Sequence, residues 1–170
     1  MREKINYERL CSSMNLFYDF LDEKIEEIMR YELPSEVLEM LFEIETLLKS
    51  GQITFAADLR RNPHKYIYEA YIENLDLIKD HFKTILFITG REGKRISKIN
   101  LTEKEELCEE LDIPILSESF EGISEDLRGQ IRSLISKIRQ VERQSSKFFL
   151  TNKERLADFA DEVEEEKDFE

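Results

Sequence analysis

The chain has 170 residues, which is enough for one domain with a buried core. Its net charge is −13 and 37% of its residues are charged, an acidity that argues against a protein that coats nucleic acid over its whole surface. Only five glycines and three prolines interrupt a composition rich in Glu, Leu, Ile and Lys, and this predicts helices rather than strands.

The N-terminal segment predicts two antiparallel helices. In the first, from about residue 3 to about residue 31, apolar residues recur at helical spacing: Ile5, Leu10, Met14, Phe17, Leu21, Ile25 and Ile28. Pro34 breaks this pattern and is tolerated in the first turn of the second helix. The apolar stripe of the second helix comprises Val37, Leu38, Leu41, Phe42, Ile44, Leu47 and Leu48. Gly51 is a suitable C-terminal stop for it.

The middle of the chain predicts one long helix between two breaks. A short helical piece at about 55–61 ends at Asn62 and Pro63. The long helix follows, from Lys65 to about Phe87, with one apolar face formed by Ile67, Ala70, Tyr71, Leu75, Ile78, Phe82 and Ile85. Its last residues, 84–89, are also compatible with a buried strand, but length and period favour the helix. Residues 90–95 are predicted to be a flexible basic connection.

Two further helices are predicted after that connection. Thr102 and Glu105 have the spacing of a capping box, for a helix that ends near Leu111. Pro114 interrupts the chain before a loop, and Ser124 can cap a second, longer helix. The buried stripe of that longer helix is expected to comprise Ile131, Leu134, Ile135, Ile138, Val141 and Phe148.

The predicted fold class is all-α, a helical bundle of five or six helices. Residues 1–111 form the helical core domain. Residues 112–155 form a loop and a basic C-terminal helix, which packs on the core or forms an arm. Residues 156–170 form an acidic C-terminal tail that we expect to be disordered, although a second capping box, Thr151 with Glu154, allows it a helical start.

Charge is unevenly distributed near the C-terminus. Residues 128–155 contain eight Lys and Arg against two acids, a net charge of +6, whereas residues 156–170 contain eight acids and one lysine, a net charge of −7. The tail has too little apolar content to fold alone. Three interpretations stay open: a solubilising end, a recognition tail in which Phe159 and Phe169 dock in pockets of a partner, or a cover for the protein's own basic helix.

Catalytic and metal-binding motifs are poorly supported. His64 and His81 lie 17 residues apart, and neither has a cysteine at a spacing that suits a metal ligand set. Gly90 and Gly93 are too close together for a phosphate-binding loop, and Arg95 stands where that motif needs a hydroxyl group. We therefore expect no cofactor, no metal and no catalytic residue. A helical-bundle enzyme with a carboxylate or metal site stays as an alternative.

Basic residues are the stronger candidates for a functional site. The candidates for contact with a partner or with nucleic acid are Arg60, Arg61, Arg91, Lys94, Arg95, Arg128, Arg132, Arg139 and Arg143. The last four fall along one edge of the predicted C-terminal helix, where they could touch a phosphate backbone. Because no aromatic stacking platform accompanies them, we favour salt bridges within the protein or to a partner protein over nucleic-acid contact.

Two cysteines, Cys11 and Cys108, are too few and too far apart to indicate a disulfide framework. No leader pattern and no apolar run of about 18 residues occurs. We therefore expect a reduced, cytoplasmic protein that does not contact a membrane.

Three segments together resemble a known family. They are Asp58-Leu59-Arg60-Arg61-Asn62, the aromatic-rich helix from Tyr66 to Phe82, and Asn100-Leu101-Thr102-Glu103-Lys104-Glu105-Glu106-Leu107. Over about residues 35–111 the chain resembles the helical domain of GINS complex subunits, in which an arginine-bearing turn enters a long central helix and a later helix starts with Leu-Thr and several Glu.

The resemblance implies a non-catalytic, helical scaffold subunit for DNA replication. Such a subunit assembles with a paralogue and joins the replicative helicase to other proteins of the replication fork. The family usually also carries a small β domain, and because residues 112–170 show no strand–turn pattern, the resemblance implies that this domain is lost or replaced here. The alternative function is a small helical regulator that binds nucleic acid directly through its basic helix.

Overall fold

The computed structural model describes residues 7–61 and 65–151, and the side chains of residues 14–51 and 70–144. These ranges contain six helices and no strand: α1 (Tyr7–Met29), α2 (Ser35–Arg61), α3 (Lys65–Ile88), α4 (Arg91–Ser97), α5 (Leu101–Leu111) and α6 (Glu125–Thr151). The predicted all-α bundle of five or six helices is therefore confirmed. The acidic tail, Glu154 of its predicted capping box, and His64 lie outside the described residues.

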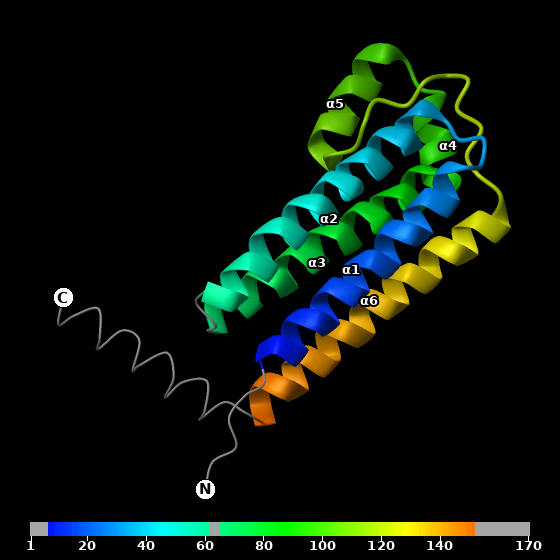
Figure 1. Ribbon diagram of the computed structural model, residues 1–170. Helices are drawn as coiled ribbons and strands as arrows, with labels where there is room; N and C mark the ends of the chain where they lie inside the picture. Colours follow the sequence, from blue (N-terminus) through cyan, green and yellow to red (C-terminus); the bar gives the residue numbers. More distant parts are fainter. Residues whose placement is uncertain (1–6, 62–64, 152–170) are drawn as a thin grey trace, which may run out of the picture.

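Four long helices, α1, α2, α3 and α6, run side by side with alternating direction (Figure 1). Helices α1 and α2 form the predicted antiparallel hairpin, and α3 packs against both α2 and α6. The short helices α4 and α5 and the connecting segment 112–124 lie together at one end of the bundle (Figure 1). Helix α6 thus belongs to the bundle and does not stand out as an arm.

The core lies along the common axis of the four long helices. Its fully buried side chains include Leu21 and Ile25 of α1, Leu41 and Ile44 of α2, Ile78 and Phe82 of α3, and Ile131 and Ile138 of α6. They belong to the stripes predicted from helical periodicity. Phe42 was wrongly assigned to its stripe, because it is 56% exposed. It lies about 100° around the helix from Leu41, beyond the edge of the apolar face.

The prediction that helix α2 ends at Gly51 was wrong. The helix continues to Arg61 and ends before Asn62 and Pro63. A Cβ atom at Gly51 would lie only 2.6 Å from the hydroxyl oxygen of Tyr18 and 2.7 Å from Nδ2 of Asn74. Three helices meet at this point, and glycine is needed there for their close approach and not for a left-handed turn.

The connection after α3 is also more ordered than predicted. Residues 84–88 are helical, and residues 91–97 form helix α4 instead of a flexible loop. Ile96 and Ser97 of α4 are buried, and a Cβ atom at Gly93 would collide with the backbone carbonyl of Ile88. The connection folds because α4 can pack directly on the end of α3.

The predicted N-cap of α5 was wrong by two residues, whereas the predicted end of the helix near Leu111 is confirmed. Asn100, not Thr102, is the N-cap: its backbone is extended and its side-chain oxygen accepts a hydrogen bond of 2.9 Å from the backbone N–H of Glu103. The predicted cap of α6 is confirmed, since the Ser124 hydroxyl oxygen accepts a 3.2 Å bond from the N–H of Leu127.

The segment between α5 and α6 crosses the start of α2. Its side chains Leu116 and Phe120 are buried, and the backbone N–H of Ser117 donates a 3.0 Å hydrogen bond to Oε1 of Glu36. Burial raises the pKa of Glu36, but hydrogen bonds from its own backbone N–H, from Ser117 and from the hydroxyl of Ser35 outweigh that effect and lower it. Glu36 is therefore a carboxylate that holds the segment on the bundle.

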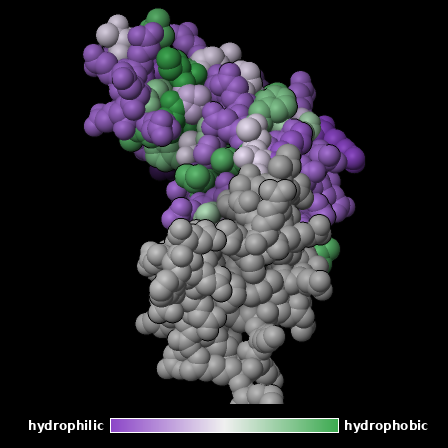
Figure 2. Space-filling model, turned by 60° about the vertical axis from the view of Figure 1, so that its left-hand side comes forward, coloured by the Kyte–Doolittle hydropathy of each residue, from purple (hydrophilic) through white to green (hydrophobic). Residues whose placement is uncertain are grey.

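The surface at this end of the bundle is mixed in character. Leu101, Leu111 and Ile115 are exposed there, but hydrophobic side chains are interspersed with hydrophilic ones over the upper part of the face that Figure 2 shows. Among the described residues, no helix combines the length with the apolar character that crossing a membrane requires.

Candidate interaction surface

Arg128 joins helix α6 to the end of helix α3. Its guanidinium donates a 2.8 Å hydrogen bond to the backbone carbonyl of Leu86 and a short one to the hydroxyl of Thr89. Its Nε atom lies 3.5 Å from Oε1 of Glu125, and the side chain is only 14% exposed. A cation at a helix C-terminus satisfies carbonyl groups that lack partners within the helix. Arg128 is thus mainly engaged inside the protein.

A second link between α3 and α6 is an ion-pair network around Lys79. The Lys79 ammonium lies 2.7 Å from Oδ1 of Asp76 and 2.9 Å from Oε1 of Glu142, with its side chain 11% exposed. Burial lowers the pKa of Lys79, but the contacts with Asp76 and Glu142 outweigh that effect and raise it. The ammonium is therefore a stable charge between the two helices.

These two links define which flanks of α3 and α6 face each other. Residues three or four apart lie on the same side of a helix. Arg132 follows Arg128 by four residues and Arg139 precedes Glu142 by three, so both lie on the flank of α6 next to α3. Arg143 follows Arg139 by four residues and continues this row. The predicted basic edge therefore runs beside α3.

Helix α3 adds a cation to the same surface. Lys83 lies four residues after Lys79 and three before Leu86, and it is exposed. We call Lys83, Arg132, Arg139 and Arg143 the α3–α6 seam. All four side chains are exposed. Arg132 forms an ion pair with Glu125, at 3.6 Å.

The other predicted contact residues are distributed over separate elements. Arg91, Lys94 and Arg95 are exposed on α4 at the end of the bundle, and Arg95 pairs with Glu92 at 2.9 Å. Helix α6 carries Arg139 and Arg143 away from that end (Figure 1). Arg60 and Arg61 lie in the last turn of α2, where side chains are outside the described set. Phe159 and Phe169 lie outside the described residues altogether.

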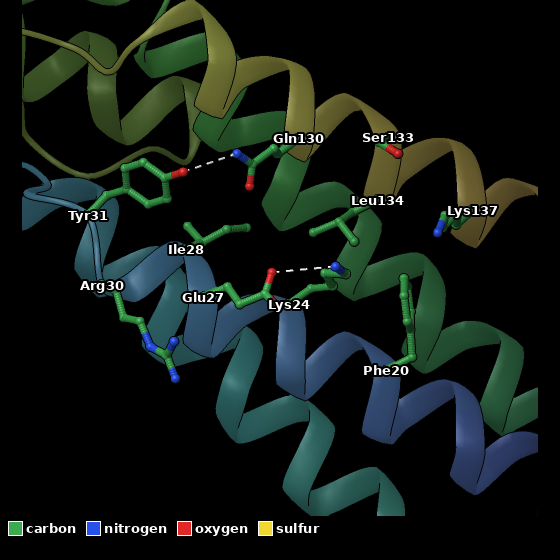
Figure 3. A pocket seen from close by; sticks show the side chains of 10 residues that line it. All are labelled: Phe20, Lys24, Glu27, Ile28, Arg30, Tyr31, Gln130, Ser133, Leu134 and Lys137. Atoms are coloured by element: carbon green, nitrogen blue, oxygen red, sulfur yellow. Dashed lines mark hydrogen bonds and ion pairs between the residues drawn. The ribbon is translucent and has the colours of Figure 1, made fainter.

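A groove between α1 and α6 was not predicted. It has a volume of about 590 Å³ and is lined by Phe20, Lys24, Glu27, Ile28, Arg30, Tyr31, Gln130, Ser133, Leu134 and Lys137. Figure 3 shows the Lys24–Glu27 pair and the hydrogen bond from Gln130 to the hydroxyl of Tyr31. The Lys137 ammonium lies 4.4 Å from the centre of the Phe20 ring. Helical spacing gives no sign of this groove, because its two walls are about a hundred residues apart in sequence.

The floor of the groove is apolar and its rim is mainly cationic. Ile28 and Leu134 are almost fully buried beneath it. Three cations line it, namely Lys24, Arg30 and Lys137, against one acid, Glu27. Such a combination suits a ligand that carries negative charge around an apolar group.

The described part of the chain offers little for proton transfer or metal binding. No described group of three or more His, Cys, Asp or Glu side chains could hold a metal ion. Among the described buried groups, the pKa is shifted at Tyr18, Glu36 and Lys79. Each of these side chains bonds to a different element of the fold, and the three do not share one cleft.

Neither a protein family nor a curated protein nor a solved structure matches the chain.

Proposed function

We propose that the chain is a non-catalytic, helical interaction subunit of a cytoplasmic nucleic-acid machine, and that it contacts an acidic partner protein through the α3–α6 seam. Its sharpest form is a GINS-like DNA replication factor, with a paralogous subunit or a helicase-associated protein as the partner. The observation that carries this proposal is the seam itself: four exposed cations in a protein whose net charge is −13.

The seam is well suited to align a partner. Arg132 and Arg143 are eleven residues apart, about 16 Å along the helix. Their helix is fixed to α3 by the contacts of Arg128 and Lys79, so the charges keep their spacing. Exposed cations of this kind increase association rates and select acidic surfaces more than they add affinity.

An apolar side chain next to the cations favours a protein as the partner. Phe87 lies four residues after Lys83 on α3, so it belongs to the same side of the helix, and it is 39% exposed. Aromatic and arginine side chains together are typical of the residues that dominate binding energy at protein interfaces. The four seam residues and Phe87 thus provide both charge and an apolar anchor.

The test uses the full-length, tagged protein expressed in its native host, with the retained proteins identified by mass spectrometry. We expect one partner of the replication machinery in stoichiometric amount. The double variant Arg132→Glu with Arg139→Glu should lose it. The matched control is Lys49→Glu with Lys98→Glu, which changes the net charge equally at exposed positions off the seam and should retain it.

A second measurement separates this function from direct nucleic-acid binding. Fluorescence anisotropy with labelled single-stranded and duplex DNA should show no binding that depends on Arg132 and Arg139. A strongly salt-dependent affinity that the double variant abolishes would support the helical regulator instead. Retention of the same partner by the seam variant would contradict the proposed surface.

A further inference from the structure

We infer that the chain's own C-terminal segment, residues 156–170, docks in the groove between α1 and α6 of the same molecule. The groove and the α3–α6 seam lie on opposite flanks of α6, so this inference goes beyond the proposed function and does not depend on it.

The groove offers an apolar floor inside a cationic rim. Ile28 and Leu134 form the floor. Within the described residues, Lys137 pairs with no carboxylate and stacks instead over the Phe20 ring, at 4.4 Å. Lys24 is shared between Glu27, at 3.4 Å, and the same ring, at 5.8 Å. An incoming carboxylate can therefore pair with Lys137 without breaking an existing ion pair.

The C-terminal segment has the complementary composition. It carries a net charge of −7, and its two phenylalanines are each placed among acids, in Asp158-Phe159-Ala160-Asp161 and Asp168-Phe169-Glu170. A phenylalanine can insert on the apolar floor while the neighbouring carboxylates meet the lysines of the rim. The seam also attracts acids, but the groove adds a buried apolar floor that a phenylalanine can cover.

The distances allow the docking within one molecule. Thr151, the last described residue of α6, is 14 residues beyond Lys137, or about 21 Å along the helix. Phe159 is eight residues beyond Thr151, and an extended chain of that length spans about 26 Å. Phe159 can therefore just reach the Lys137 end of the groove, and Phe169 can reach it with a longer span of chain.

The test uses the absence of tryptophan from this protein. Full-length Phe159→Trp and Phe169→Trp each carry a single tryptophan, whose emission and acrylamide quenching report its burial. We expect at least one of them to emit at shorter wavelength, with a several-fold smaller quenching constant, than a free peptide of residues 156–170 with the same substitution. Raising the salt concentration should move the signal towards that of the peptide.

Charge reversal identifies the docking surface. Adding Lys24→Glu with Lys137→Glu should shift the tryptophan signal to that of the free peptide. Lys83→Glu with Arg139→Glu, which makes the same charge change on the seam, should leave it unaltered. All four substituted side chains lie at the surface, and far-UV circular dichroism should show equal helicity; the milder Lys137→Ala should give a partial shift of the same sign.

Three outcomes would overturn the inference. A tryptophan signal equal to that of the free peptide in both single variants would mean that the segment is not docked. If the seam variant released the segment and the groove variant did not, the segment would be docked on the α3–α6 seam and not in the groove. If the short-wavelength emission of the tryptophan were lost when the protein is diluted, the occupant of the groove would be the segment of a second copy.

Discussion

The side-chain amide of Asn74, on α3, donates a 2.9 Å hydrogen bond to the hydroxyl oxygen of Tyr18, on α1. The same amide nitrogen donates to the carbonyl of Leu47, on α2, at 3.2 Å, so one polar side chain connects three helices. The Tyr18 ring packs edge-on against Tyr71, with 5.4 Å between ring centres. Burial raises the pKa of Tyr18 to about 12, although the bond from Asn74 acts in the opposite direction. The hydroxyl group therefore stays protonated at ordinary pH.

Gly51 should be sensitive to the smallest possible enlargement. Gly51→Ala places a methyl group against Tyr18 and Asn74, and we expect it to lower the free energy of unfolding by about 1–3 kcal/mol. The matched control is Gly129→Ala, since a Cβ atom at Gly129 meets nothing within 4 Å and the position is exposed on α6. That control should gain roughly 0.5–1 kcal/mol from better helix propensity. Urea unfolding measures both; equal effects of the two substitutions would contradict the close approach at Gly51.

Helical periodicity predicted most of the core of the four long helices, but neither the buried Leu116 and Phe120 of the connecting segment nor the polar contacts. Ile78 and Phe82 are buried because a 3.6-residue repeat places them on one face, and that repeat is visible in a single segment. A glycine such as Gly51 is compatible with a helix end or with close packing, and the choice depends on Tyr18 and Asn74, which come from distant segments.

The candidate site shows the same limit. The basic edge of α6 was predicted from spacing alone, and its cations lie along α3 as one row. Spacing could not indicate that Arg128 is engaged at the end of α3, because the position of that end in space depends on packing. The groove was missed for a related reason, since Phe20 and Lys137 meet only when α1 and α6 are assembled.

The ion pair between Lys79 and Glu142 should contribute to stability. We expect Lys79→Met to lower the free energy of unfolding by about 1.5–3 kcal/mol. The reason is that the partly buried carboxylate of Glu142 loses its charged hydrogen bond with Lys79. The exposed Lys83→Met, one turn away on the same helix, should stay within about 0.5 kcal/mol of wild type. A double-mutant cycle with Glu142→Leu isolates the pair. A coupling energy near zero would mean that Lys79 stabilises the bundle mainly through its aliphatic stem.

Glu36 should make the bundle sensitive to acid. Its pKa in the folded state lies below the ordinary value of 4.5, so its carboxylate stabilises the fold above that value and loses this contribution as the pH falls through the folded-state pKa. Urea unfolding between neutral pH and about pH 3 should show a steeper acid-side loss for wild type than for Glu36→Gln. The exposed Glu39→Gln, one turn further along α2, should leave the profile unchanged. Parallel profiles for wild type and Glu36→Gln would refute this role.

Asn100 and Thr102 are both suitable N-caps of α5 by residue type, but only Asn100 occupies the cap position. Asn100 has the extended backbone of an N-cap, with φ −65° and ψ 155°, whereas Thr102 is already inside the helix. We expect Asn100→Ala to cost about 0.5–2 kcal/mol, because the N–H of Glu103 loses its acceptor. Thr102→Ala should be neutral or slightly stabilising, since alanine has the higher helix propensity. Thermal unfolding of both variants decides between the caps, and a larger loss for Thr102→Ala would restore the capping box predicted from the sequence.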